Sequence, residues 1–79
     1  MNRIIKLLWE FRGISALGTA EHHIIHLKEF AQREKLTFYE AGKEEISDNL
    51  VIAFLKVEEP AAQRIYNMIK PDRGEVIKD

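Results

Sequence analysis

The sequence predicts a single α+β domain over residues 1–79, in which a four-stranded antiparallel sheet carries two helices on one face. Runs of strand length alternate with stretches of helical periodicity in the order strand, helix, strand, strand, helix, strand. The two most apolar strand runs suit the centre of a sheet, whereas the other two carry charges that suit its edges. A chain of 79 residues allows one small domain with one core.

Residues 3–11 form the first predicted element. Their apolar side chains fit both the alternation of a strand and the spacing of a helix, so periodicity alone allows two interpretations. No helix cap precedes the run, and Arg12-Gly13 follows it. We expect a strand, with a helix over the same residues as the alternative.

Residues 19–35 carry the clearest helical pattern. Thr19 is a candidate N-cap, and Glu21 suits the positive end of the helix dipole. Apolar residues recur at helical spacing at Ala20, Ile24, Leu27 and Ala31. The opposite, polar face holds His22, His26, Glu29 and Arg33. We therefore expect an amphipathic helix.

Two strands joined by a turn follow the helix. Residues 37–42 form the first of them, and we expect the charged residues 43–45 after Gly42 to weaken this strand or bend it outward. Ser47-Asp48-Asn49 is a turn signal. Residues 49–57 are apolar at nearly every position, which predicts a strand buried on both faces.

A second helix and a short strand complete the chain. Pro60 suits the first turn of a helix whose apolar stripe runs to Ile69, and Pro71 stops it. Residues 72–74 form a turn, and residues 75–78 a final strand. The complete order is the ferredoxin-like βαββαβ pattern, whose usual sheet order is 4-1-3-2.

Composition excludes several functional classes. Twelve basic and 13 acidic residues give a net charge of −1, so the chain lacks the basic footprint of a nucleic-acid binder. It has no cysteine, which excludes a disulfide framework, a zinc finger and a thiol nucleophile. No apolar run suits a membrane span and no N-terminal targeting signal is seen, so we expect a cytoplasmic protein.

One face of such a sheet carries no helices, although both central strands have apolar residues on both faces. One alternate set is Leu50, Ile52 and Phe54. Exposed apolar patches mark interfaces, and small domains often gain stability by association. We therefore expect a homodimer that buries the open sheet face. The alternative is that long lysine and glutamate side chains cover the patch.

Two short segments, His26-Leu27-Lys28-Glu29-Phe30 and Tyr39-Glu40-Ala41-Gly42, resemble the YCII-related branch of the dimeric α/β-barrel superfamily. That branch has a His-Leu pair in its first helix, a glycine in its second strand and an Asp-Pro pair after its second helix. Here the last pair is reversed, as Pro71-Asp72, so a catalytic role does not carry over directly to Asp72. The resemblance implies a ferredoxin-like fold and a homodimer more than an activity.

The predicted topology gathers three connections at one end of the domain, residues 12–19, 42–49 and 70–74. The start of the first helix, with its free backbone N–H groups, lies there too. Positive side chains beside a helix start favour a small anionic ligand. The candidate ligand-binding residues are Arg12, Ser15, Thr19 and Arg73. The alternative is a set of surface charges beside turns, neutralised by neighbouring acidic residues.

The three histidines are the candidate catalytic and metal-binding residues. His22 or His23, in the first turn of the helix, can act as a general acid or base beside the anion site. His22 and His26 are four residues apart and can reach one divalent metal ion, with Glu29 as a further ligand. Solvated or packed histidines are the structural alternative.

The sequence thus predicts a homodimeric ligand-binding or regulatory module, with its anion site where the first strand meets the first helix. A small dimeric-barrel enzyme that uses a histidine as general acid or base is the alternative. Divalent metal binding through His22 and His26 is a third interpretation, and no other cofactor is expected.

Overall fold

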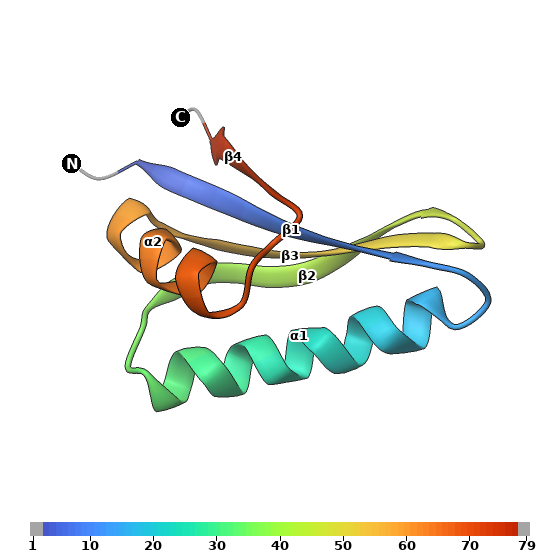
Figure 1. Ribbon diagram of the computed structural model, residues 1–79, viewed down its shortest axis with the longest axis horizontal. Helices are drawn as coiled ribbons and strands as arrows, with labels where there is room; N and C mark the ends of the chain where they lie inside the picture. The colour runs from blue at the N-terminus through green and yellow to red at the C-terminus, as the bar shows by residue number, and fades with distance from the viewer. Residues whose placement is uncertain (1–2, 78–79) are drawn as a thin grey trace.

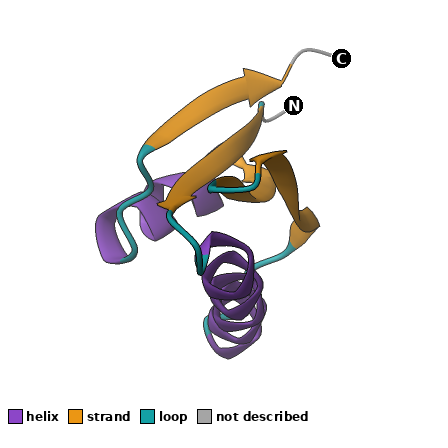
Figure 2. Ribbon diagram, turned by 90° about the vertical axis from the view of Figure 1, so that its right-hand side faces the viewer, coloured by secondary structure: helices purple, strands orange, loops and turns teal. Residues whose placement is uncertain are grey.

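The computed structural model describes residues 3–77 and shows the predicted α+β architecture. The elements in chain order are β1 (Ile4–Arg12), α1 (Ala16–Arg33), β2 (Phe38–Ser47), β3 (Leu50–Glu58), α2 (Glu59–Met68) and β4 (Arg73–Ile77). The strands form one antiparallel sheet in the order β2-β3-β1-β4, and both helices lie on one of its faces (Figure 1, Figure 2). The ferredoxin-like layout is therefore confirmed, and β1 is a strand rather than a helix.

The main core lies between the helices and the sheet, and strand alternation decides which residues belong to it. Its buried side chains are Leu7, Trp9, Val51, Ala53, Leu55 and Val57 from the strands and Ala16, Ala20, Leu27, Phe30, Ala62 and Ile65 from the helices. Both helices therefore bury one face and expose the other. Within the described part of the chain, neither helix is long and apolar enough to cross a lipid bilayer.

A second, smaller apolar cluster lies on the open face of the sheet. It consists of Leu8, Ile52 and Phe54, which are only 3%, 7% and 7% exposed in the single chain. The amines of Lys6 and Lys56 lie 4.6 and 5.8 Å from the centre of the Phe54 ring. Lysine side chains of the same chain thus cover the patch that motivated an open-face homodimer, and the homodimer itself stays a prediction.

Ion pairs to β2 hold both lysines over the Phe54 ring. Lys6 pairs with Glu44, and Lys56 with Glu40 at 2.8 Å. The hydrogen bond from Lys56 and its positive charge lower the pKa of Glu40 below its ordinary value. Gly42, the register partner of Phe54, leaves room for the phenyl ring. A Cβ atom at position 42 would lie only 2.9 Å from Phe54 Cζ.

Helix α1 begins at Ala16, three residues before the predicted start at Thr19. Gly13 has a φ of +106°, which glycine adopts readily, and its N–H donates to the carbonyl of Asn49 at 2.9 Å. The chain therefore reverses immediately after β1, and Ala16 joins the buried stripe. Thr19 lies inside the helix, so the prediction of Thr19 as N-cap is wrong.

Helix α1 ends in a Schellman-type turn. Lys35 adopts a left-handed φ of 57°. The N–H of Leu36 then donates to the carbonyl of Ala31 at 2.8 Å, and the N–H of Lys35 to that of Gln32 at 3.2 Å. The helix thus ends at Arg33 rather than at residue 35.

Strand β2 runs to Ser47, five residues beyond the predicted end at Gly42. The charged residues 43–45 do not end the strand, because they pair with β3 at an edge where polar side chains remain solvated. Two register shifts, around Tyr39 and Ile46, mark β-bulges. Both bulge residues are apolar and more than half exposed.

Strand β4 begins at Arg73, within the predicted turn 72–74. Arg73 and Gly74 pair with Leu8 and Leu7 of β1, so the backbone is already extended there. The predicted strand 75–78 thus starts two residues too late. Its last residue lies outside the described residues.

Candidate functional site

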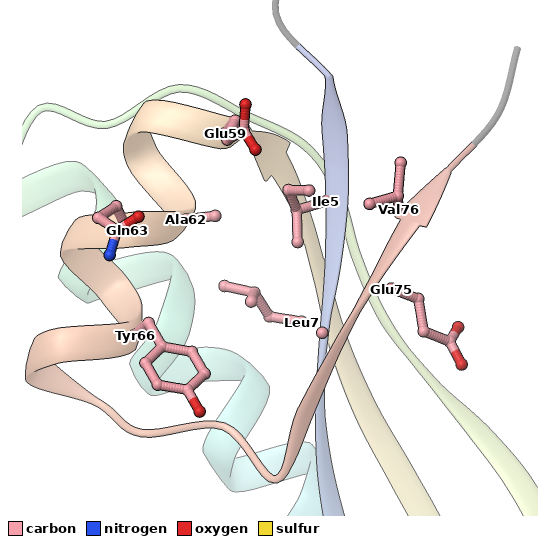
Figure 3. A pocket seen from close by; sticks show the side chains of 9 residues that line it. Ile5, Leu7, Glu59, Ala62, Gln63, Tyr66, Glu75 and Val76 are labelled. Atoms are coloured by element: carbon pink, nitrogen blue, oxygen red, sulfur yellow. The ribbon is translucent and has the colours of Figure 1, made fainter.

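A groove runs between α2 and the edge of the sheet formed by β1 and β4 (Figure 3). Helix α2 has ten residues and packs against β1 and β3, so it leaves the adjoining face of β4 open. The groove has a volume of about 350 Å³, at the lower end of the range for small-molecule sites. Its lining residues are Ile5, Leu7, Glu59, Ala62, Gln63, Tyr66, Gly74, Glu75 and Val76.

Strand alternation makes the floor of the groove apolar. Ile5 and Leu7 point to the helix side of β1, and their register partners on β4 are Val76 and Gly74. Figure 3 shows both β1 side chains directed toward α2, with the ring of Tyr66 at one end of the groove. Tyr66 and Val76 are each about half exposed, so a ligand there would gain apolar contact.

Gly74 keeps the floor open because it has no side chain. A Cβ atom at this position would lie 3.5 Å from Ile5 Cγ2 and 3.5 Å from Leu7 Cδ2, which is ordinary van der Waals distance. A Cβ atom therefore fits the strand without a clash, and the rest of a larger side chain would take up space in the groove that Gly74 lines. This makes Gly74 the natural position for a variant that fills the site.

The charges along the groove are negative. Two glutamates, Glu59 and Glu75, border the groove, and no basic side chain among residues 3–77 lines it. Glu59 stands at one end of the groove (Figure 3), where Arg3 Nη2 lies 2.7 Å from its Oε2 atom. Such an exposed pair contributes about 0–1 kcal/mol, so a bound cation can replace Arg3. Glu75 directs its side chain to the other face, as the register partner of Lys6.

The two predicted anion-binding arginines share one acidic partner. Glu10 accepts from Arg12 Nη2 through Oε1 and from Arg73 Nη1 through Oε2, both at 3.0 Å. The backbone N–H of Glu10 donates to Asp72 Oδ2 at 2.6 Å. Glu75 Oε2 also lies 4.0 Å from Arg73 Nε. Two guanidinium groups and three carboxylates give a cluster without net positive charge, so its attraction for an anion is small. The anion site stays a prediction.

Arg12 and the histidines are not brought together. Arg12 and Glu10 lie on the open face of the sheet, whereas His23 packs on the helix face. The connection from α2 to β4 also stops short of the predicted end, because the N–H of Asp72 donates to the carbonyl of Leu8 in the middle of β1 at 2.8 Å. Of the three predicted connections, only residues 12–19 and 42–49 meet at this end of the domain, where the N–H of Gly13 donates to the carbonyl of Asn49.

Three other predicted residues do lie together. Ser15, Thr19 and His22 line a shallow hollow with Gly18 on the first turns of α1. Ser15 is the N-cap residue, but its side chain makes no capping hydrogen bond. The hollow is open to solvent and receives no arginine.

His23 is the histidine that contacts the core. Its ring centre lies 5.0 Å from that of Trp9 and 5.3 Å from that of Phe11. His23 Nε2 and Trp9 Nε1 are buried and have no hydrogen-bond partner within residues 3–77. Burial, followed by the charge of His26, lowers the pKa of His23 below its ordinary value of 6.5. A packed boundary residue describes His23 better than an accessible catalytic base does.

The lowered pKa of His23 predicts that the chain loses stability in mild acid. The folded state favours the neutral imidazole, so its contribution is complete above the unfolded pKa of about 6.5 and decreases as the pH falls below it. Urea unfolding at about pH 7.5 and pH 5.5, with EDTA present, measures the loss. His23→Phe keeps a ring against Trp9 and should show the smaller loss. Equal losses in both proteins would contradict the prediction.

His22 and His26 meet on the exposed face of α1. Their Nε2 atoms are 2.9 Å apart, and their rings are nearly perpendicular, with centres 4.5 Å apart. Glu29 Oε1 lies 3.3 Å from His26 Nδ1. The predicted pairing of the two histidines is therefore present. No group of three or more metal-binding side chains occurs among the described residues.

The residues of the α2–β4 groove were not among the sequence-based candidates. Gly74 lies in the segment 72–74, which the sequence predicts as a turn. One signal did point to the groove. Pro71 follows Tyr66 by only five residues and stops the helix, which ends at Met68, so the second helix is too short to cover the whole sheet.

The comparisons with other proteins identify no relative. No protein-family model matches this chain, and no curated protein and no solved structure matches it either. The expected relation to the YCII-related branch stays a prediction, and the fold rests on the βαββαβ topology itself.

Proposed function

We propose that the chain is a small ligand-binding module whose site is the groove between α2 and β4. The supporting observation is that α2 leaves the helix side of β4 uncovered while Gly74 provides no side chain to fill the space. The floor is apolar, one end carries Glu59, and the volume suits a compact molecule. The occupant is a small amine with an aromatic or aliphatic body.

Each part of this ligand has a counterpart in the groove. The apolar body contacts Ile5, Leu7 and Val76 and lies against the Tyr66 ring, while the ammonium group takes the place of Arg3 at Glu59. The proposal keeps the functional class expected from the sequence but moves the site away from Arg12 and Arg73. Both of those guanidinium groups already share Glu10.

The test compares phenylethylamine with phenylpropionate, which share a ring and differ in charge. Both are titrated into ¹⁵N-labelled protein at millimolar concentration, and the amide signals of Gly74 and Val76 are followed. We expect the amine to shift these signals saturably and the carboxylate to bind about tenfold more weakly or worse. Equal binding of the two would overturn the cationic part of the proposal.

Gly74→Val is expected to abolish amine binding without loss of stability. The Cβ atom of valine fits at ordinary contact distances, its methyl groups occupy space in the groove, and valine suits a β-strand. Glu59→Gln removes the charge and should weaken binding of the amine but not of the carboxylate. Glu45→Gln, on the exposed β2 edge, is the matched control and should bind as the unaltered chain does. Retained affinity in Gly74→Val would place the ligand elsewhere and overturn the proposal.

A further inference from the structure

The exposed face of α1 brings two imidazole nitrogens within hydrogen-bond distance of each other. His22 and His26 are one helical turn apart, and their Nε2 atoms are 2.9 Å from each other. Both side chains are exposed on the side of α1 that faces solvent, away from the groove. A small ion can therefore reach both nitrogens without any change in the fold.

Glu29 lies beside one of the two rings. Its Oε1 atom lies 3.3 Å from His26 Nδ1, so its negative charge favours the tautomer that carries the proton on Nδ1, in which the Nε2 lone pair faces His22. A carboxylate on the far nitrogen is the usual outer partner of a metal-binding histidine, and it raises the basicity of the ligand. The helix spacing supplies this partner three residues after His26.

The distance between the two donors indicates which ions fit. With metal–nitrogen bonds of about 2.0–2.1 Å, two donors 2.9 Å apart subtend an angle of about 90° at the ion. A tetrahedral ion such as Zn²⁺ would need donors about 3.3–3.4 Å apart at the same bond lengths. Ni²⁺ and Cu²⁺ prefer neighbouring ligands at a right angle.

We propose that His22 and His26 chelate one divalent transition-metal ion of right-angle geometry, Ni²⁺ or Cu²⁺, on the exposed face of α1. Glu29 acts as the outer partner of His26, and water completes the coordination. Metal binding requires His22 to carry its proton on Nδ1, so that both Nε2 lone pairs are free. The site is independent of the α2–β4 groove and of any second copy of the chain.

The informative comparison is Ni²⁺ against Zn²⁺, because Cu²⁺ binds most nitrogen sites more tightly than either. Calorimetric titration of NiCl₂ and ZnCl₂ into protein without a polyhistidine tag measures both affinities. We expect one ion per chain and tighter binding of Ni²⁺. Tighter binding of Zn²⁺, or one ion per two chains with a metal-dependent dimer in sedimentation, would overturn the proposal.

Three variants assign the ligands. Loss of an outer partner alone weakens metal binding by about 10–100-fold, so His22→Gln and His26→Gln should each weaken Ni²⁺ by about tenfold or more. Both positions are exposed, and the circular dichroism of these variants should match that of the unaltered chain. His23→Phe is the control and should bind Ni²⁺ normally, because His23 packs on the core. Unchanged affinity in either glutamine variant would exclude the chelate.

Discussion

Ile65→Ala is expected to lower the free energy of unfolding by about 2–5 kcal/mol. Ile65 is 0% exposed and, with Ala62, supplies the buried contacts of α2 in the main core. Its truncation removes apolar burial and leaves a cavity that a short helix cannot close. A domain of 79 residues has a total stability of about 4–12 kcal/mol, so this loss is a large share of the whole.

Urea unfolding measures this loss, because the single tryptophan of the chain, Trp9, lies in the same core and reports its exposure. The midpoint should fall while the slope is unchanged. Met68→Ala is the matched control on the same helix, since Met68 is 58% exposed. It should change the free energy of unfolding by less than about 0.5 kcal/mol. Similar losses in the two variants would mean that α2 is not anchored through Ile65.

Gly42→Ala is expected to destabilise the chain by about 1–3 kcal/mol. The added Cβ atom would lie 2.9 Å from Phe54 Cζ, closer than carbon atoms approach, so the ring must move. Lys6 and Lys56 both extend their amines over the Phe54 ring, which clusters with Leu8, and a shift of the ring uncovers that small cluster.

Gly18→Ala makes the same chemical change with the opposite expected sign. Gly18 lies inside α1, and apart from its chain neighbours and the adjacent helix backbone no atom of the described residues lies within 4 Å of an added Cβ. Alanine should therefore stabilise the helix by about 0.5–1 kcal/mol. Repeating Gly42→Ala in a Phe54→Leu background tests the cause, since a smaller side chain relieves the contact. An unchanged cost in that background would show that Phe54 is not the reason.

The centre of the fold could be predicted from the sequence because its pattern is local. The apolar runs in β1 and β3 identify the two central strands, and the charges of β2 and β4 identify the edges. The extension of β2 could not be predicted in this way. Residues 43–45 have no strand pattern of their own, and β3 decides their conformation by offering backbone partners.

The candidate site depends on tertiary packing more strongly than the order of the strands does. The sequence predicts Arg12 as the first residue after the strand, whereas it is the last residue of β1. The face on which it lies depends on which alternate set of β1 meets the helices. That choice is made by packing against α1 and α2, and it puts Arg12 beside Glu10 on the open face. The His22–His26 pair was predictable because it depends on helical spacing alone. The groove was not, because it depends on how far α2 extends across the sheet.

The bulges at Tyr39 and Ile46 make the two edges of the sheet unequal. Bulges turn backbone groups out of line and increase the twist of a strand, and charged side chains lie between the two bulges of β2. A foreign strand therefore finds no straight row of hydrogen-bonding groups at this edge. β4 is regular but only five residues long. If two copies paired through their β4 edges, only the bulged β2 edges would stay exposed, and these disfavour the addition of further strands.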